Sequence, residues 1–301
     1  MDTRLVLLLE HVQQILKLFI HYNTDVEMNC YEDRVEFQTM DARRISIAEF
    51  RLAASACLEY SCTRPSTVYL NLKTITPLLM RLPKDMTCSL SFDPERNDRL
   101  EVQAFNKGVL EYRQLVNFLD VESERFIIPE NTEYCVQMKM RSGWLHETIK
   151  NLDELGDDIH IYIPATGTNL TLFTQDSEMG ETIIVRPLVS PSDESEEEEE
   201  EKQEDPAPKK RKTQKEKKPD LIHLLSFQHQ EVCMGYQKTH LARIVANGSA
   251  FATDCVIQYD SNIPLTIRFT HPVLGCAIYY LAPKVMDDDE QANIRFKLRS
   301  F

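Results

Sequence analysis

Glycine, tryptophan and the short motifs of common catalytic sites are scarce or absent in this sequence. The 301 residues include 8 glycines, 14 prolines and a single tryptophan, which excludes fibrous and wholly disordered classes of protein. None of the patterns G-x-x-x-x-G-K-[ST], G-x-G-x-x-G, G-x-S-x-G and H-E-x-x-H occurs. We therefore expect a binding or scaffolding role, with an enzyme of unrecognised site as the alternative of a different class.

Metal and disulfide motifs are also missing. The eight cysteines form no C-x-x-C pair and most lie in apolar, strand-like runs, which favours reduced thiols in an intracellular protein over disulfides or zinc. The carboxylates of Asp287–Glu290 could hold a metal, but four adjacent acidic residues are more typical of a solvated tail. The apolar run Leu5–Leu9 is followed at once by Glu10. We expect no metal, no cofactor, no secretion signal and no membrane span.

Negative charge dominates the chain, with a formal net charge of −14. Residues 193–218 contain 11 acidic and 8 basic residues, a net of −3, so the rest of the chain carries −11. Proteins that coat nucleic acid with their whole surface neutralise phosphates with Lys and Arg, so this balance argues against that mode of binding. A local basic lining on an acidic body remains compatible with it.

The segment 190–220 differs in composition from the rest. Six consecutive glutamates, Glu196–Glu201, precede the basic block Lys209–Lys212, and almost no apolar residue could pack. We expect a disordered insert. Three interpretations of the basic block stay open: a nuclear import signal, a contact with nucleic acid, or an internal partner for the glutamates.

Two halves of the chain repeat one order of signals: a helix, paired strands, a short helix and more strands. Helical periodicity predicts helices at Glu10–His21, Leu72–Leu82 and Thr239–Asn247, and one that Ser142 caps, running to Asp153. Pro77 fits only the first turn of its helix. Strands are predicted at Arg4–Leu9, Val26–Tyr31, Arg34–Thr39, Ile45–Leu52, Val68–Leu70, Met86–Phe92, Arg99–Phe105, Val109–Phe118, Tyr134–Met140, Ile159–Ile163, Asn169–Thr174, Thr182–Pro187, Ser226–Met234, Thr253–Tyr259, Pro264–Thr270 and Ala277–Leu281.

Each half thus approximates two βαβββ units, which predicts an α+β fold with domains 1–117 and 133–301 and a connector of residues 118–132. The connector is acidic at first but ends in the apolar run Phe126-Ile127-Ile128 before Pro129. Plain linkers are polar throughout. We therefore expect the connector to lie on the surface with its apolar end half buried.

Three stretches together resemble the eukaryotic sliding clamp family, proliferating cell nuclear antigen. The first is Gln38-Thr39-Met40-Asp41. The second is the connector, with the segments Leu119-Asp120-Val121-Glu122 and Ile128-Pro129-Glu130. The third is Tyr279-Tyr280-Leu281-Ala282-Pro283-Lys284. Their order and spacing match from Arg4 to Glu290. This chain differs from cellular clamps in three segments: the insert 190–220, the bulkier connector and the tail after Glu290. These differences indicate a divergent member of the family, for example one from a large DNA virus.

The resemblance implies a two-domain clamp subunit, three of which close head to tail into a ring, helices inside and sheets outside. Such a ring encircles double-stranded DNA without sequence specificity, serves as a polymerase processivity factor, and tethers polymerase, clamp loader, ligase or nuclease in replication and repair. It uses no cofactor and no catalytic residue. It would work at intracellular replication sites, in the nucleus through Lys209–Lys212 or in a cytoplasmic viral factory. A monomeric or heterotrimeric clamp-like processivity or checkpoint factor is the alternative.

The resemblance also implies that polar helix faces line the hole and contact DNA. The basic candidates are Lys17, Lys73, Arg81, Lys107, Arg141, Lys150, Lys238 and Arg243. At four places where the family usually has a basic residue or His, this chain has Gln13, Gln14, Met80 and Glu154. Either the DNA contact is weaker or the basic block of the insert compensates.

Edge strands at opposite ends of the subunit would pair between neighbours in such a ring. The candidate residues are Val109, Leu110, Tyr112, Gln114 and Val116 on one strand and Thr182, Ile183, Ile184 and Val185 on the other.

The family also binds partner peptides of the form Q-x-x-aliphatic-x-x-aromatic-aromatic in an apolar groove, a mode in which a few anchors carry the affinity. The implied groove residues are Met40, Arg44, Ile45, Phe126, Ile128, Pro129, Pro264, Tyr280, Leu281, Ala282 and Pro283.

The tail 291–301 allows three interpretations. Gln291 and Ile294 fit the first two positions of that peptide, but Lys297 and Leu298 stand where aromatics belong. The alternation of Ile294, Phe296 and Leu298 fits an edge strand as well, and we favour a strand or a frayed tail over docking in the chain's own groove.

Overall fold

A computed structural model describes residues 3–19, 22, 25–93, 98–121, 126, 132–152, 156–176, 178–190, 221–261 and 263–299. The chain divides into two compact units. Unit 1 comprises residues 1–132, 246–252 and 268–281, and unit 2 comprises residues 133–245, 253–267 and 282–301. The division therefore falls after Thr132, but two later segments group with unit 1, and the domain boundaries drawn from the sequence stay a prediction.

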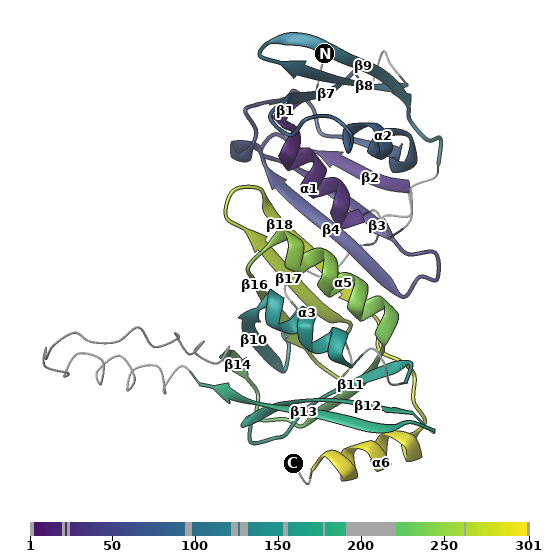
Figure 1. Cartoon of the computed structure of the whole chain (residues 1–301), viewed down its shortest axis with the longest axis vertical. Helices are drawn as coiled ribbons and strands as arrows, with labels where there is room; N and C mark the ends of the chain where they lie inside the picture. The colour runs from purple at the N-terminus through teal and green to yellow at the C-terminus, as the bar shows by residue number, and fades with distance from the viewer. Residues whose placement is uncertain are drawn as a thin grey trace, which may run out of the picture. The chain divides into compact units, whose positions relative to one another are not determined.

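Unit 1 contains two successive βαβββ segments (Figure 1). The first comprises β1 (Thr3–Leu8), α1 (Leu9–Phe19), β2 (Asp25–Cys30), β3 (Arg34–Met40) and β4 (Ser46–Ala53). The 3-10 helix η1 (Ala54–Ala56) and β5 (Glu59–Cys62) lead to the second: β6 (Ser66–Asn71), α2 (Leu72–Leu79), β7 (Thr87–Phe92), β8 (Arg99–Asn106) and β9 (Val109–Asn117). With β18 (Gly275–Leu281), the strands form the orders β5-β1-β7-β8-β9 and β18-β4-β3-β2-β6.

Unit 2 follows the same plan. Its elements are β10 (Val136–Arg141), α3 (Ser142–Asn151), β11 (Asp158–Ile163), β12 (Asn169–Asp176), β13 (Gly180–Val189), β14 (Ile222–Phe227), β15 (Val232–Gln237), α5 (Lys238–Phe251), β16 (Asp254–Tyr259), β17 (Leu265–His271) and α6 (Asp288–Leu298), with α5 and β17 passing from one unit to the other. Within unit 2 the strand order is β15-β11-β12-β13-β14-β10-β16. The α+β class and the βαβββ repetition predicted from the sequence are confirmed.

Each sheet has one face against helices and one opposite face, called here the outer face. In unit 1, Met28 and Phe37 lie in the core with α1 residues such as Ile15. Because side chains alternate along a strand, their neighbours on β2 and β3 lie on the outer face. In unit 2, Ile161 and Leu172 pack with Leu145 of α3. Their neighbours Tyr162 and Phe173 therefore point to the outer face.

One helix start and one proline differ from the prediction. Ser142 is the first residue of α3 and not its cap, because its buried hydroxyl donates to Thr253 O at 2.8 Å instead. Asn71 caps α2 by accepting from the N–H of Lys73 at 3.0 Å. Pro77 lies at the sixth of the eight residues of α2, not in the first turn. At this position Pro77 cannot donate the hydrogen bond to the carbonyl of Lys73, four residues earlier, and α2 ends two residues later.

The predicted strand Ser226–Met234 is wrong, since β14 ends at Phe227 and β15 begins at Val232. The chain turns between them, where His229 has a φ of 57°. The sequence gives no clear signal for such a turn, because a residue other than glycine takes the left-handed conformation.

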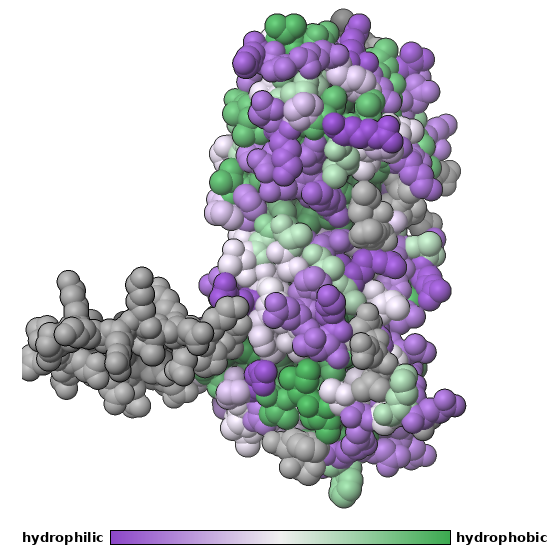
Figure 2. All heavy atoms as spheres, in the orientation of Figure 1, coloured by the Kyte–Doolittle hydropathy of each residue, from purple (hydrophilic) through white to green (hydrophobic). Residues whose placement is uncertain are grey.

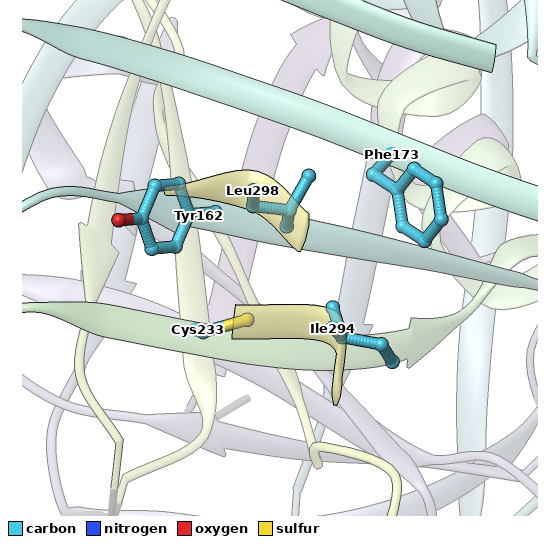
Figure 3. Packing of buried hydrophobic residues seen from close by; sticks show 5 residues of the cluster. All are labelled: Tyr162, Phe173, Cys233, Ile294 and Leu298. Carbon is cyan, nitrogen blue, oxygen red and sulfur yellow. The ribbon is translucent and has the colours of Figure 1, made fainter. Parts of the chain in front are cut away.

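The predicted strand or frayed end for the tail is also wrong, because residues 288–298 form the helix α6. The Asp287 carboxylate accepts from the N–H of Glu290 at 2.7 Å and caps this helix, so the acidic run is a helix start favoured by the helix dipole. Ile294 and Leu298, one turn apart, are buried against Tyr162, Phe173 and Cys233 of the outer face (Figure 3). Phe296, which made the pattern look alternating, is 81% exposed.

All eight cysteines are free thiols, five of them buried. Among the described residues, no helix is long and apolar enough to cross a bilayer.

Candidate functional site

The loop after β3 is fixed by one carboxylate. Asp41 is buried, and its side chain accepts hydrogen bonds from the N–H groups of Arg43 (3.1 Å), Ile45 (2.7 Å) and Ser46 (2.6 Å). The N–H of Arg44 donates to Asp41 O at 2.9 Å, and Arg44 has a φ of 58°. These bonds offset the cost of the left-handed residue and hold the loop in one conformation.

Phe126 of the connector is held against β3. The side-chain amide of Gln38 donates to Phe126 O at 3.2 Å and accepts from Phe126 N–H at 3.3 Å. One glutamine thus gives the connector the two hydrogen bonds that a neighbouring strand would supply. The sequence motif contained Gln38 but did not reveal this role. Ile128 and Pro129 lie outside the described residues.

A pocket with a volume of about 210 Å³ opens between the loop, Phe126 and the outer face of unit 1. Three predicted groove residues line it, Met40, Arg44 and Phe126, but its other walls are Asp25, Glu27, Gln38, Thr39 and Tyr69. Ile45 follows Arg44 in the sequence and is half-buried, but it does not line the pocket. The sequence pattern did not predict these polar walls, because they depend on which strands pair and in what register. Glu27 pairs with Gln38 on one neighbouring strand and with Tyr69 on the other.

The buried carboxylate of Glu27 is fixed by two donors. Asn29 donates to one oxygen at 2.6 Å and the Tyr69 hydroxyl to the other at 3.0 Å. A fixed negative charge therefore stands in the wall of the pocket.

The apolar row on the same face continues through β4 to β18. Met40 pairs with Ile47, and Ile47 pairs with Tyr280, so the three side chains share the outer face. Leu281 was predicted in the groove, but its side chain is 1% exposed and points to the core, so this prediction is corrected. The remaining candidates belong to unit 2, where Ala282 and Pro283 are half-buried and Pro264 is exposed.

Seven of the eight basic candidates are exposed. In unit 1 these are Lys17, Lys73, Arg81 and Lys107, and in unit 2 they are Arg141, Lys150 and Arg243. The prediction that Lys238 contacts DNA is corrected. Lys238 is buried and its ammonium donates to Gly156 O, so it is not presented to a ligand at the surface.

Gln13 also differs from the expectation of a residue on the polar face of α1. It is 4% exposed, and its amide donates to Leu79 O at 2.8 Å and Leu82 O at 3.1 Å. It thereby satisfies carbonyls at the end of α2, which lack partners within the helix. Gln14 and Met80 are half-buried, and Glu154 lies outside the described residues.

The two strands predicted to pair between subunits have open edges within the described part of the chain. β9 ends its sheet, with Val109 66%, Leu110 46% and Leu115 51% exposed. β13 pairs with β12 along its length but with β14 only at Leu188 and Val189. Figure 2 shows a hydrophobic group in the β12–β13 region of unit 2.

Not all predicted edge residues point outward. Val116 is buried in the core of unit 1, and Tyr112 and Gln114 are half-buried, with the Gln114 amide donating to Thr74 O at 3.2 Å. Strand alternation places these three side chains opposite the exposed Arg113 and Leu115, and their part in a subunit interface stays a prediction. On β13, Thr182, Ile183, Ile184 and Val185 are all partly exposed.

Three buried cysteines on β2, β7 and β16 have a perturbed pKa. Burial raises the pKa of Cys30, Cys88 and Cys255 to about 12, so these thiols stay protonated at neutral pH and are poor nucleophiles. Burial also lowers the pKa of His160 and His271. Such isolated shifts are typical of structural positions.

Comparison with known proteins gives one consistent result. Residues 7–115 match the family model for the N-terminal domain of proliferating cell nuclear antigen. The proliferating cell nuclear antigen of Caenorhabditis elegans is 22% identical over 273 residues, covering 90% of this chain and 91% of that protein. The Saccharomyces cerevisiae protein of the same name is 24% identical over 168 residues, covering 54% and 62%.

Proposed function

We propose that this chain is a divergent DNA sliding clamp of the proliferating cell nuclear antigen family and that three copies close head to tail into a ring around duplex DNA. The ring would act as a processivity factor for DNA polymerase and as a tether for replication and repair proteins. It would need no cofactor. Its place of action would be the sites of DNA replication, in the nucleus if Lys209–Lys212 serve as an import signal.

The observation that carries this proposal is the pair of open edges. β9 exposes apolar side chains at the end of its sheet, and β13 leaves the edge of residues 180–187 without a strand partner among those described. Open, flat, apolar edges lead to aggregation unless another strand covers them. Pairing of β9 of one subunit with β13 of the next would cover both, and a heterologous contact of this kind closes into a ring when the rotation fits.

The DNA contact would use the exposed basic residues of both units. Lys17 and Lys73 lie on the packed helices α1 and α2, and Lys150 and Arg243 lie on α3 and α5. Contacts to phosphates fix position without reading bases, which suits a protein that slides. Because Lys238 and Gln13 are buried, we expect a thin lining and a shallow dependence of affinity on salt.

Partner proteins would bind through short peptides whose aliphatic and aromatic anchors contact Met40, Ile45, Phe126 and Tyr280 of unit 1. The ordered loop and the fixed Phe126 support a preformed site, which lowers the entropic cost of binding. Polymerase, clamp loader, ligase and nuclease are the partner classes expected.

A native mass measurement tests the ring. We expect about three times the subunit mass of 35.0 kDa at micromolar concentration, and retention on closed circular DNA but not on linear DNA. Leu110→Asp should reduce the mass to that of one subunit while leaving the circular dichroism spectrum unchanged. A wild-type mass of one subunit at every concentration would instead support the monomeric or heterotrimeric alternative.

A further inference from the structure

The helix α6 contacts the strand β13 as well as the strands beneath it. Ile183 of β13 packs against the apolar cluster under α6 that Figure 3 shows. The ammonium of Lys297 forms an ion pair with Glu181, the second residue of β13, and lies 5.1 Å from the centre of the Phe173 ring. α6 therefore holds β13 at two outer-face positions near the start of the strand.

β13 depends on such contacts because a neighbouring strand covers only one side of most of it. Its ladder with β12 runs over residues 180–187, whereas β14 pairs with it only at residues 188 and 189. On the face toward α3, the Arg186 guanidinium lies 6.0 Å from the centre of the Trp144 ring. Segments with exposed backbone groups and few buried contacts open most readily. The contacts with α6 restrain the outer face of this open edge.

α6 in turn needs its seat on unit 2 in order to be helical. It has 11 residues, and isolated helices shorter than about 12–15 residues are marginal in water. Its buried side chains are Ile294 and Leu298. When α6 leaves its seat, Ile183 and Glu181 lose the contacts described above, and the buried thiol of Cys233 becomes accessible. Docking of α6, restraint of β13 and protection of Cys233 therefore occur together.

We propose that docking of α6 is coupled to the pairing of β13 with β9 of the next subunit, so that α6 stabilises the closed ring. The inference rests on the proposed function, because it presumes that β13 and β9 pair between copies of this chain. A strand that α6 already restrains loses less conformational freedom when a partner strand binds it. The coupling is reciprocal, so a bound β9 should also keep α6 in place. Lys297, Glu181 and Ile183 are then positioning residues for assembly.

Charge reversal at the ion pair tests the effect of α6 on the ring. In analytical ultracentrifugation, Lys297→Glu should raise the subunit concentration at which half of the rings dissociate by about fivefold, because two carboxylates then lie side by side. Adding Glu181→Lys restores opposite charges and should return this midpoint to within about twofold of wild type. Lys139→Glu is the matched control and should leave the midpoint unchanged. Lys139 is also an exposed lysine of unit 2 in an ion pair, but its partner at 3.4 Å is Asp254, and the pair joins β10 to β16.

Alkylation of Cys233 tests the reverse effect. Cys233 lies beneath α6 and is 0% exposed, so iodoacetamide reaches it once α6 has left its seat. We expect wild-type rings to react there at least about threefold more slowly than Leu110→Asp, the variant expected to stay a single subunit. Cys255, 1% exposed in the same unit but on β16, is the internal control and should react equally in both proteins. Mass spectrometry of the peptides measures the two sites separately.

Loosening α6 connects the two measurements. Leu298→Ala removes a buried anchor, so it should both speed the alkylation of Cys233 and weaken the ring. Phe296→Ala, at an exposed position of the same helix, should do neither.

The outcomes separate the coupling from the ring. If wild-type protein stays a single subunit at every concentration, the proposed ring is wrong and the coupling with it. If wild-type protein forms rings, the coupling is refuted when Leu298→Ala exposes Cys233 without weakening the ring, or when Cys233 reacts equally fast in wild-type rings and in Leu110→Asp. Rings of Lys297→Glu as stable as those of Lys139→Glu, or a lack of rescue by Glu181→Lys, would refute the role of the ion pair, and the Leu298→Ala result would then decide the coupling.

Discussion

The outer faces of the two units differ more than their shared βαβββ plan suggests. In unit 1 the outer face carries buried carboxylates beside the apolar row of Met40, Ile47 and Tyr280. Glu27, Glu36 and Glu49 are each less than 9% exposed and have hydrogen-bond partners. In unit 2 the outer face is apolar at Tyr162 and Phe173 and is closed by α6. A buried carboxylate needs hydrogen-bond donors, whereas an apolar face needs a cover. The two units thus share one plan but differ in what covers and satisfies their outer faces.

The segments that lie on the two outer faces, Phe126 on unit 1 and α6 on unit 2, are held by different interactions. Phe126 is held on unit 1 by two hydrogen bonds from one glutamine side chain. α6 is held on unit 2 by buried Ile294 and Leu298, with exposed ion pairs such as Arg299–Glu231 at its end. Apolar burial stabilises by a few kcal/mol per side chain, and a neutral hydrogen bond by about 1 kcal/mol.

The largest effect is therefore expected at Leu298. Leu298→Ala should destabilise the protein by about 2–5 kcal/mol in urea denaturation, because the side chain is fully buried and a cavity would remain. Phe296→Ala, on the same helix but 81% exposed, is the control and should change stability by less than about 0.5 kcal/mol. Equal effects of the two substitutions would contradict the packing of α6.

A smaller effect is expected at Gln38. Gln38→Leu removes both bonds to Phe126 and should cost about 1–2 kcal/mol. Faster tryptic cleavage after Arg125 would report release of this part of the connector. Gln103→Leu, in the other sheet of unit 1, is the control, since Gln103 bonds Glu101 and not the connector. An unchanged cleavage rate in Gln38→Leu would show that other contacts hold Phe126.

The smallest effect is expected from pH, through His160 on the outer face of unit 2. Its Nδ1 is buried without a hydrogen-bond partner in the described part of the chain, and Gly235 leaves it room, since a Cβ there would lie 2.9 Å from the ring. Burial lowers its pKa, opposed by Asp158 and Glu290 and assisted by Lys284.

The unfolded chain therefore binds the His160 proton more readily than the folded chain does. The stability contribution is fully present above the unfolded pKa of about 6.5 and declines as pH falls toward the lowered folded value. His160→Gln should flatten the dependence of the melting temperature on pH between 7 and 5. His146→Gln, a half-buried imidazole on α3, should leave the slope closer to wild type. A slope unaffected by His160→Gln would refute the assignment.

Much of the fold followed from local pattern, and the errors have identifiable causes. The periodicity of Val12, Ile15, Leu16 and Phe19 predicted α1, and all four are buried. The alternation of Ile294, Phe296 and Leu298 led to the wrong prediction of a strand. Residues i and i+4 lie on the same face in a helix and in a strand, so a short segment does not distinguish the two. Met40, Arg44 and Phe126 were predicted together, whereas the carboxylates beside them were not, because a polar residue in a strand reads as solvent-facing.

The sequence by itself determined the α+β class, the βαβββ segments and the basic and apolar candidates, because these depend on residue types at short spacing. Only the tertiary structure decided which candidates are presented. Lys238 and Gln13 are polar but buried because carbonyls at Gly156, Leu79 and Leu82 accept their hydrogen bonds. Glu27, Gln38 and Tyr69 lie far apart in sequence and meet because strand register brings them together. Burial and register are properties of the packed chain, and they turned a predicted apolar groove into one with a charged wall.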